Sequence, residues 1–191
     1  MSLRPVAVMA LVLTAWTPAA AAASLTLDER QREEAIRVGQ RSVTSEAFGE
    51  EWQVTNGAGE TVTVITPFHR IALAARHAAF RNEPLKAQDQ ERMLADLKDK
   101  LMLAVELRGP REDFARHFTP RLLVDGREVQ PSVAQNERTA IREDDGRFRA
   151  RCVYWFPARE LRGDARLVLV VKRAPGGEDV AKFDIDLSTM R

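Results

Sequence analysis

The stretch Phe148-Arg-Ala-Arg-Cys-Val-Tyr-Trp-Phe156 decides the fold class of this chain. Side chains of a β-strand point alternately to its two faces, so every second residue of this stretch lies on the same side. One row holds Phe148, Ala150, Cys152, Tyr154 and Phe156, and the other holds Arg149, Arg151, Val153 and Trp155. The stretch predicts a long strand with the first row buried.

Further strand signals lie on both sides of it. Alternation from Leu101 to Leu107 predicts a half-buried strand, and Asp125-Gly126 fits the type I′ turn of a tight hairpin over 122–129. The apolar run 167–171 predicts a central strand covered on both faces, and alternation over 183–187 predicts a last strand. About seven strands with turns between them predict an immunoglobulin-like antiparallel β-sandwich over 99–191.

The region 24–98 has helical periodicity and one hairpin. We expect a first helix from Ser24 to about Gln40 that begins with a capping box of Thr26 and Glu29. The other expected elements are a hairpin of 52–54 with 61–65, a helix from Pro67 to about Phe80, and a third helix over 87–98. The alanines of the second helix would let it approach a sheet closely.

These elements together predict an α+β fold in which the N-terminal helical and hairpin region packs on the sandwich. A single mixed sheet with the second and third helices across one face is the alternative architecture.

Residues 1–23 have the layout of a secretory signal peptide. Arg4 provides a positive start, and Val6 to Trp16 form an apolar run of 11 residues, where a membrane-spanning helix needs about 20. The small-residue pattern places the cut after Ala21, Ala22 or Ala23. An uncleaved membrane anchor is the alternative.

The location that follows is outside the cytoplasm. No cysteine follows the apolar run closely, since Cys152 is the only one, so a lipid anchor on cysteine is not expected. We expect a soluble periplasmic or secreted protein that has no stable membrane insertion after cleavage. Its fold forms without an internal disulfide, and alternation places Cys152 in the core as a small buried hydrophobe.

The charge balance argues against nucleic acid as a partner. Without Arg4 the chain has 28 basic and 28 acidic residues. Nucleic-acid binders show a basic excess, because neutralising phosphates supplies most of their affinity.

No motif for a cofactor or a metal stands out. His69 and His77 are eight residues apart, about 12 Å along a helix, which is too far for two ligands of one metal. We expect both to be partly exposed on an arginine-rich face. His69, Arg76 and His77 nevertheless form the polar cluster from which a site between the helices and the sheet would be built.

Two hypotheses about function remain open. The first is a non-catalytic module that binds an envelope protein or glycan; its expected contact face consists of Arg149, Arg151, Trp155, Asp184 and Asp186. The arginines and aspartates of this face could also be cross-strand pairs. The second is a small hydrolase or ligand-binding protein with its site at the helix–sheet crevice. The oligomeric state does not follow from the sequence.

Overall fold

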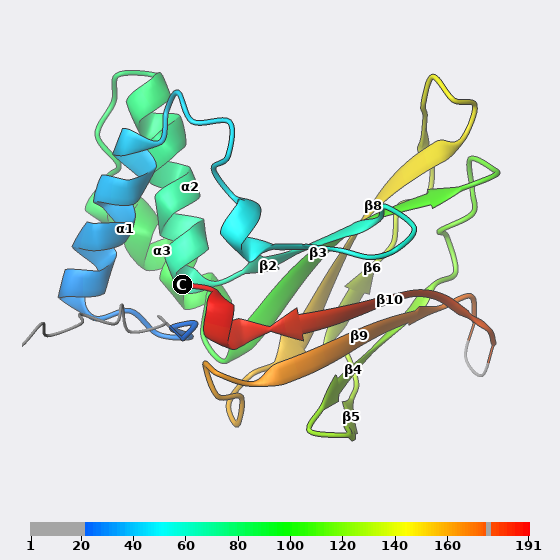
Figure 1. Ribbon diagram of the computed structural model, residues 1–191. Helices are drawn as coiled ribbons and strands as arrows, with labels where there is room; N and C mark the ends of the chain where they lie inside the picture. The colour runs from blue at the N-terminus through cyan, green and yellow to red at the C-terminus, as the bar shows by residue number, and fades with distance from the viewer. Residues whose placement is uncertain (1–21, 175–176) are drawn as a thin grey trace, which may run out of the picture.

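The computed structural model describes residues 22–174 and 177–191 and shows an α+β fold (Figure 1). The helices are α1 (Glu29–Arg41), α2 (Pro67–Phe80) and α3 (Ala87–Leu97), with 3-10 turns η1 (Glu50–Trp52) and η2 (Leu187–Thr189). Sheet A has the order β1 (Gln53–Thr55), β2 (Thr61–Ile65), β3 (Lys100–Gly109), β8 (Phe148–Pro157) and β6 (Val133–Gln135), and β7 (Ile141–Arg142) also pairs with β8. Sheet B has the order β10 (Asp179–Asp186), β9 (Arg166–Lys172), β4 (Thr119–Val124) and β5 (Arg127–Val129).

The two antiparallel sheets pack face to face. Tyr154 and Phe156 of β8 are fully buried, and Leu169 and Phe183 of sheet B belong to the same apolar cluster. The alternation predicted for 148–156 is therefore confirmed, and the alternative of a single mixed sheet is wrong. The strand β9 is central in sheet B, but on its outer side Val168 is only half-buried, so the prediction that it is covered on both faces was too strong.

The hairpin β1–β2 is continuous with the sandwich. β2 pairs with β3 over five residues, from Thr61 opposite Glu106 to Ile65 opposite Met102. The predicted regions 24–98 and 99–191 thus share sheet A.

The helices lie together at one end of the two sheets (Figure 1). α2 begins as predicted, with Thr66 as its N-cap and Pro67 at the first turn. The capping box of α1 is formed by Asp28 and Gln31, two residues after the predicted Thr26 and Glu29, because residues 25–26 form a bend and the helix begins only at Glu29.

Small residues hold α1 and α2 at close range. A Cβ atom added to Gly39 of α1 would lie 2.1 Å from the carbonyl oxygen of Ala72 and 2.8 Å from the Cβ of Ala75. The alanines of α2 therefore allow close approach of another helix, whereas the sequence suggested approach to a sheet.

Arg191 joins η1 to the start of α2. Its main-chain oxygen accepts hydrogen bonds from Trp52 Nε1 at 2.7 Å and from Thr66 Oγ1 at 2.6 Å. Its guanidinium group donates to both carboxylate oxygens of Glu51, at 2.9 and 2.7 Å. These bonds connect residues that are more than a hundred positions apart in the chain.

The predicted signal peptide lies almost entirely outside the described residues. In the part that the structure describes, none of the helices has the length and apolar character needed to cross a bilayer.

Replacing Gly39 with alanine tests the contact between the helices. We expect Gly39→Ala to lower the free energy of unfolding by about 1–3 kcal/mol, because overpacking against a backbone oxygen outweighs the better helix propensity of alanine. Urea unfolding measures the change. Gly57→Ala is the matched control, since a Cβ there meets nothing within 4 Å. Equal stability of the two variants would show that the helices are not in close contact.

Candidate functional site

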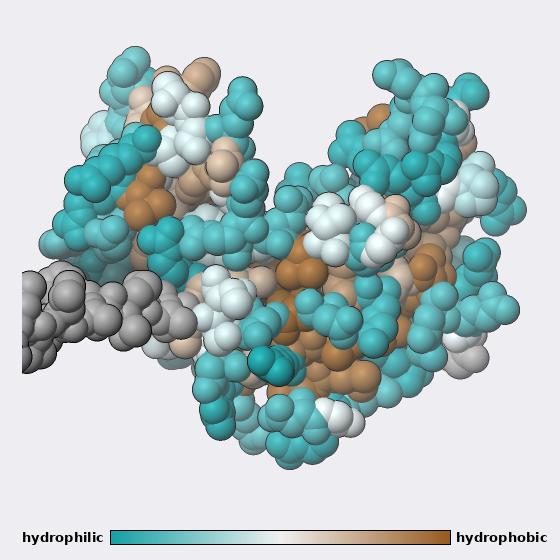
Figure 2. Space-filling model, viewed as in Figure 1, coloured by the Kyte–Doolittle hydropathy of each residue, from teal (hydrophilic) through white to brown (hydrophobic). Residues whose placement is uncertain are grey.

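The outward side of sheet A is a candidate interaction surface, here called the open face. The register aligns Met102, Trp155 and Val133 in one row across β3, β8 and β6, and Ala104, Val153 and Gln135 in the next. Glu106 and Arg151 follow in the third row. Figure 2 shows that the molecule is hollowed between the helices and the β7–β8 hairpin, above the position of β2 and β3 in Figure 1.

The apolar end of the open face is centred on Trp155. Its ring is half-buried, and Lys100 Nζ lies 5.3 Å from the ring centroid, which is within cation–π range. Val133, directly opposite on the edge strand, is 52% exposed. Aromatic residues and methionine, here Trp155 and the half-buried Met102, are enriched at protein interfaces.

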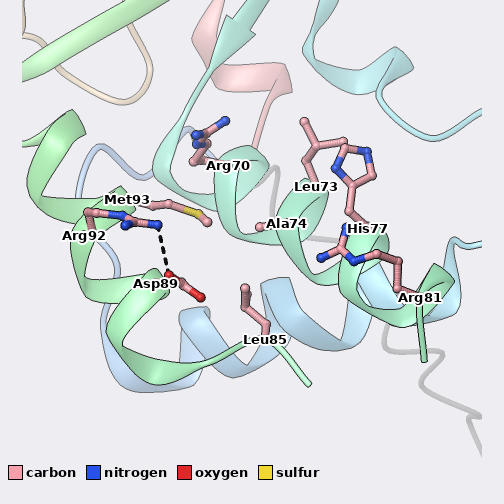
Figure 3. A pocket seen from close by; sticks show the side chains of 9 residues that line it. All are labelled: Arg70, Leu73, Ala74, His77, Arg81, Leu85, Asp89, Arg92 and Met93. Carbon is pink, nitrogen blue, oxygen red and sulfur yellow. Dashed lines mark hydrogen bonds and ion pairs between the residues drawn. The ribbon is translucent and has the colours of Figure 1, made fainter. Parts of the chain in front are cut away.

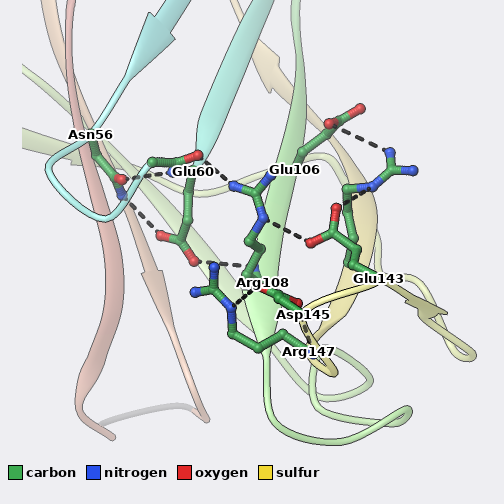
Figure 4. Close-up of polar contacts among 9 residues, drawn as sticks. Asn56, Glu60, Glu106, Arg108, Glu143, Asp145 and Arg147 are labelled. Carbon is green, nitrogen blue, oxygen red and sulfur yellow. Dashed lines mark hydrogen bonds and ion pairs between the residues drawn. The ribbon is translucent and has the colours of Figure 1, made fainter.

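The other end of the open face carries an ionic network (Figure 4). Glu143 accepts from Arg108 Nε at 2.9 Å and lies 3.1 Å from Arg149 Nε, and Arg149 is also 3.7 Å from Glu106. The buried Glu60 accepts from the Arg108 main-chain N–H at 3.2 Å. The network joins the β1–β2 loop, β3 and the segment between β7 and β8, so we assign it a structural role.

Arg151 lies between the two ends and differs from the neighbouring arginines. Its side chain is exposed, and among the described residues it forms no ion pair, whereas Arg149 is held by two carboxylates. Arg151 therefore presents a guanidinium group to solvent on the same face as Trp155, two rows further along β8. Arginine and tryptophan are the residues most enriched among those that dominate binding energy.

The structure separates the five residues of the predicted contact face. Arg149, Arg151 and Trp155 lie together on the open face, whereas Asp184 and Asp186 lie on β10 in sheet B. The alternative of cross-strand pairs between them is wrong, because β8 and β10 are in different sheets. The sequence pattern predicted on which face of its strand each residue lies, but it did not predict which strands pair with one another.

The aspartates have local partners instead. Asp186 lies 3.3 Å from Arg166, and Asp184 lies 3.6 Å from Lys182. The hydrogen bonds from Ser188 lower the pKa of Asp186.

His69, Arg76 and His77 do not form one site. His69 is only 4% exposed and stacks on Trp52, with ring centroids 4.5 Å apart. Arg76 donates to the Ser45 carbonyl at 2.9 Å and lies over the Phe48 ring. The expectation that His69 is partly exposed was wrong, since the aromatic cluster around η1 covers this side of α2.

His77 instead lines a hollow of about 300 Å³ between α2 and α3 (Figure 3). The apolar part of the lining includes Leu73, Leu85 and Met93. Asp89, on the α3 side, accepts a hydrogen bond from Arg92 at 3.0 Å and so is paired within its own helix. Among the described residues His77 forms no hydrogen bond with Asp89, so the hollow does not contain a histidine oriented by that carboxylate.

Metal ligands do not come together either. Within residues 22–174 and 177–191, no three side chains of His, Cys, Asp or Glu are grouped so that they could hold a metal ion.

Comparison with known proteins finds no matching family and no matching curated protein. A crystal structure from Burkholderia pseudomallei K96243, described as a novel protein of unknown function, aligns with a TM-score of 0.43 and 12% identity. The alignment covers 86% of this chain and 92% of that one.

The buried His69 makes stability depend on pH. Burial lowers the pKa of His69 from 6.5 to about 4, since the charged ring would lose its hydration. The unfolded chain therefore binds a proton that the folded chain does not, and stability falls as pH decreases from about 6.5 to about 4. The loss amounts to about 3 kcal/mol over this range.

Urea unfolding at several pH values measures this pH dependence of the free energy of unfolding. His69→Phe should remove it while keeping the stack on Trp52, whereas His77→Gln, a change at an exposed position, should retain it. An unchanged pH slope in His69→Phe would assign the dependence to another group.

The buried Cys152 gives a second test of the core. It is fully buried and free, and burial raises the pKa of its thiol, so little thiolate is present at neutral pH. We expect a thiol reagent to label the native protein at least about a hundredfold more slowly than the protein in urea. As a control, Phe80→Cys in a Cys152→Ala background places a thiol where the side chain is 75% exposed, and it should be labelled rapidly in both states. Rapid labelling of native Cys152 would contradict its burial.

Proposed function

We propose that this protein is an exported, non-catalytic binding module whose open face contacts a protein or glycan of the cell envelope. The observation that carries the proposal is that the row of Trp155, Met102 and Val133 shares the open face with Arg151, which lies two rows further along and forms no ion pair among the described residues. A tryptophan and an arginine on one partly apolar, otherwise polar surface match the composition of binding hot spots.

Export is supported by the signal-peptide layout of residues 1–23. The neutral charge balance and the single, buried Cys152 are consistent with a soluble protein in the periplasm or outside the cell. A partner in the envelope follows from this location.

We also propose that the sandwich is immunoglobulin-like. The order β2-β3-β8-β6 in sheet A corresponds to strands A-B-E-D of that fold, and β10-β9-β4-β5 in sheet B corresponds to G-F-C-C′. In this assignment α2 and α3 are an insertion between strands A and B. Immunoglobulin-like domains serve many functions, so the proposal for binding rests on the open face and not on the fold.

The alternative of a hydrolase or ligand-binding site at the helix–sheet crevice has less support. Phe68, His69 and Ile71 are each at most 5% exposed, and Met93 packs against the core. Apolar and aromatic side chains thus fill the space where a polar site would have to form.

Site-specific crosslinking in the envelope tests the binding proposal. A photo-crosslinking amino acid at Val133, beside Trp155, should give one reproducible adduct, identified by mass spectrometry. The same amino acid at Lys182, an exposed position on sheet B, is the matched control and should give none.

Charge reversal at Arg151 then tests the contact itself. We expect Arg151→Glu to reduce the adduct from position 133 at least about tenfold, the effect of losing one hot-spot residue. Since Arg151 is exposed, the melting temperature should change little. Equal adducts from positions 133 and 182, or an undiminished adduct in Arg151→Glu, would contradict a role for the open face.

A further inference from the structure

The main chain of Ala23 binds to a small site, here called the socket, that is formed by the β8–β9 loop and η2. The Ala23 N–H donates to the carbonyl oxygen of Gly163 at 2.9 Å and to that of Leu187 at 3.1 Å. Ala23 is only 4% exposed, and Leu187 is fully buried. Leu187 in turn donates its N–H to the Ala165 carbonyl at 3.0 Å, so the socket is formed by the β8–β9 loop and η2.

Gly163 allows this contact because it has no side chain. A Cβ atom at this position would lie 2.1 Å from the carbonyl oxygen of Ala23, far closer than nonbonded atoms approach. Glycine is required at position 163 because the main chain of Ala23 approaches it so closely. The segment that follows continues the attachment, since Leu25 and Leu27 pack against the core and Ser24 Oγ accepts from Gln31 Nε2 at 2.9 Å.

The socket distinguishes between the three cleavage positions that the sequence leaves open. A cut after Ala23 would remove the docked residue and leave two carbonyl oxygens without their donor. Leu187 is fully buried, and a buried polar group that loses its hydrogen-bond partner destabilises the folded chain. A cut after Ala22 would convert the Ala23 N–H into an α-ammonium group at a buried position, where a charge loses hydration.

A cut after Ala21 avoids both costs. Ala22 is exposed, so the new α-ammonium group would be in water, and the Ala23 amide would keep both hydrogen bonds. Ala19 and Ala21 supply the small residues that a signal peptidase requires at the third and first positions before the cut.

We infer that processing leaves Ala22 as the first residue of the mature protein and that Ala23 is its N-terminal anchor, docked between Gly163 and Leu187. The inference about the cut rests on the proposed export, whereas the anchor is a property of the folded chain.

The cleavage is tested by expressing the complete chain in an exporting bacterial host and measuring the intact mass and N-terminal sequence of the product. We expect an N-terminus at Ala22. A product that begins at Ala23, Ser24 or later would overturn the inferred cut while leaving export intact. A product that retains residues 1–21 would overturn the cut, and its recovery in the cytoplasm would overturn export as well.

The anchor is tested without export. Proteins that begin at Ala22 and at Ser24 are released from a removable N-terminal fusion, each with and without Gly163→Ala. We expect the Ser24 form to melt about 3 °C or more below the Ala22 form. Gly163→Ala should lower the melting temperature of the Ala22 form in the same way, because its Cβ meets the Ala23 carbonyl.

The decisive measurement is how much Gly163→Ala lowers the melting temperature in the Ala22 form compared with the Ser24 form. Gly163→Ala should have little effect in the Ser24 form, where the Ala23 carbonyl is absent. If the substitution shifts the melting temperature equally in both forms, or if removing Ala22 and Ala23 has no effect, the anchor does not exist.

Discussion

The pairing of β3 with β8 is the constraint on which the rest of the structure depends. It runs without interruption over ten residues, from Lys100 opposite Pro157 to Gly109 opposite Phe148. Because side chains alternate along a strand, a slip by one residue would expose Tyr154 and bury arginines. The register therefore fixes the inner surface that sheet B covers, and β2 and β6 extend sheet A from its two sides.

The same register determines the open face. Residues that lie between the buried positions of β8 face outward by necessity, so the core and the candidate contact surface are two sides of one strand. Arg151 can change with little consequence for packing, whereas a change at Cys152, its neighbour in sequence, alters the buried core. A surface of this kind can diverge while the fold is retained.

Local signals in the sequence predicted the local structure well. The Asp125-Gly126 turn, in which both residues have positive φ, and the Thr66-Pro67 start of α2 depend on a few adjacent residues. The choice of strand partners does not depend on adjacent residues, because alternation contains no information on which strands are neighbours. For this reason the alternative of pairs between Arg149 or Arg151 and the aspartates of β10 was wrong. The periodicity of α2 likewise identified an apolar face but not that α1 would cover part of it.

The candidate site was predictable only in part. The outward position of Trp155 and Arg151 followed from the sequence, but the exposed row with Val133 required the position of a three-residue edge strand whose pattern is too short to detect. The burial of His69 depends on Phe48 and Trp52, which come from a segment without regular periodicity. Tertiary contacts of this kind are invisible to a pattern of neighbouring residues.

The contacts of Arg191 have a consequence for the order in which the molecule is completed. Trp52 and Thr66 hydrogen-bond to its main-chain oxygen, and Ala23 bonds to Leu187 a few residues earlier. During synthesis or translocation these N-terminal residues emerge long before their partners. The hydrogen bonds of Trp52 and Thr66 to Arg191, and that of Ala23 to Leu187, can therefore form only after residues 187–191 have been synthesised.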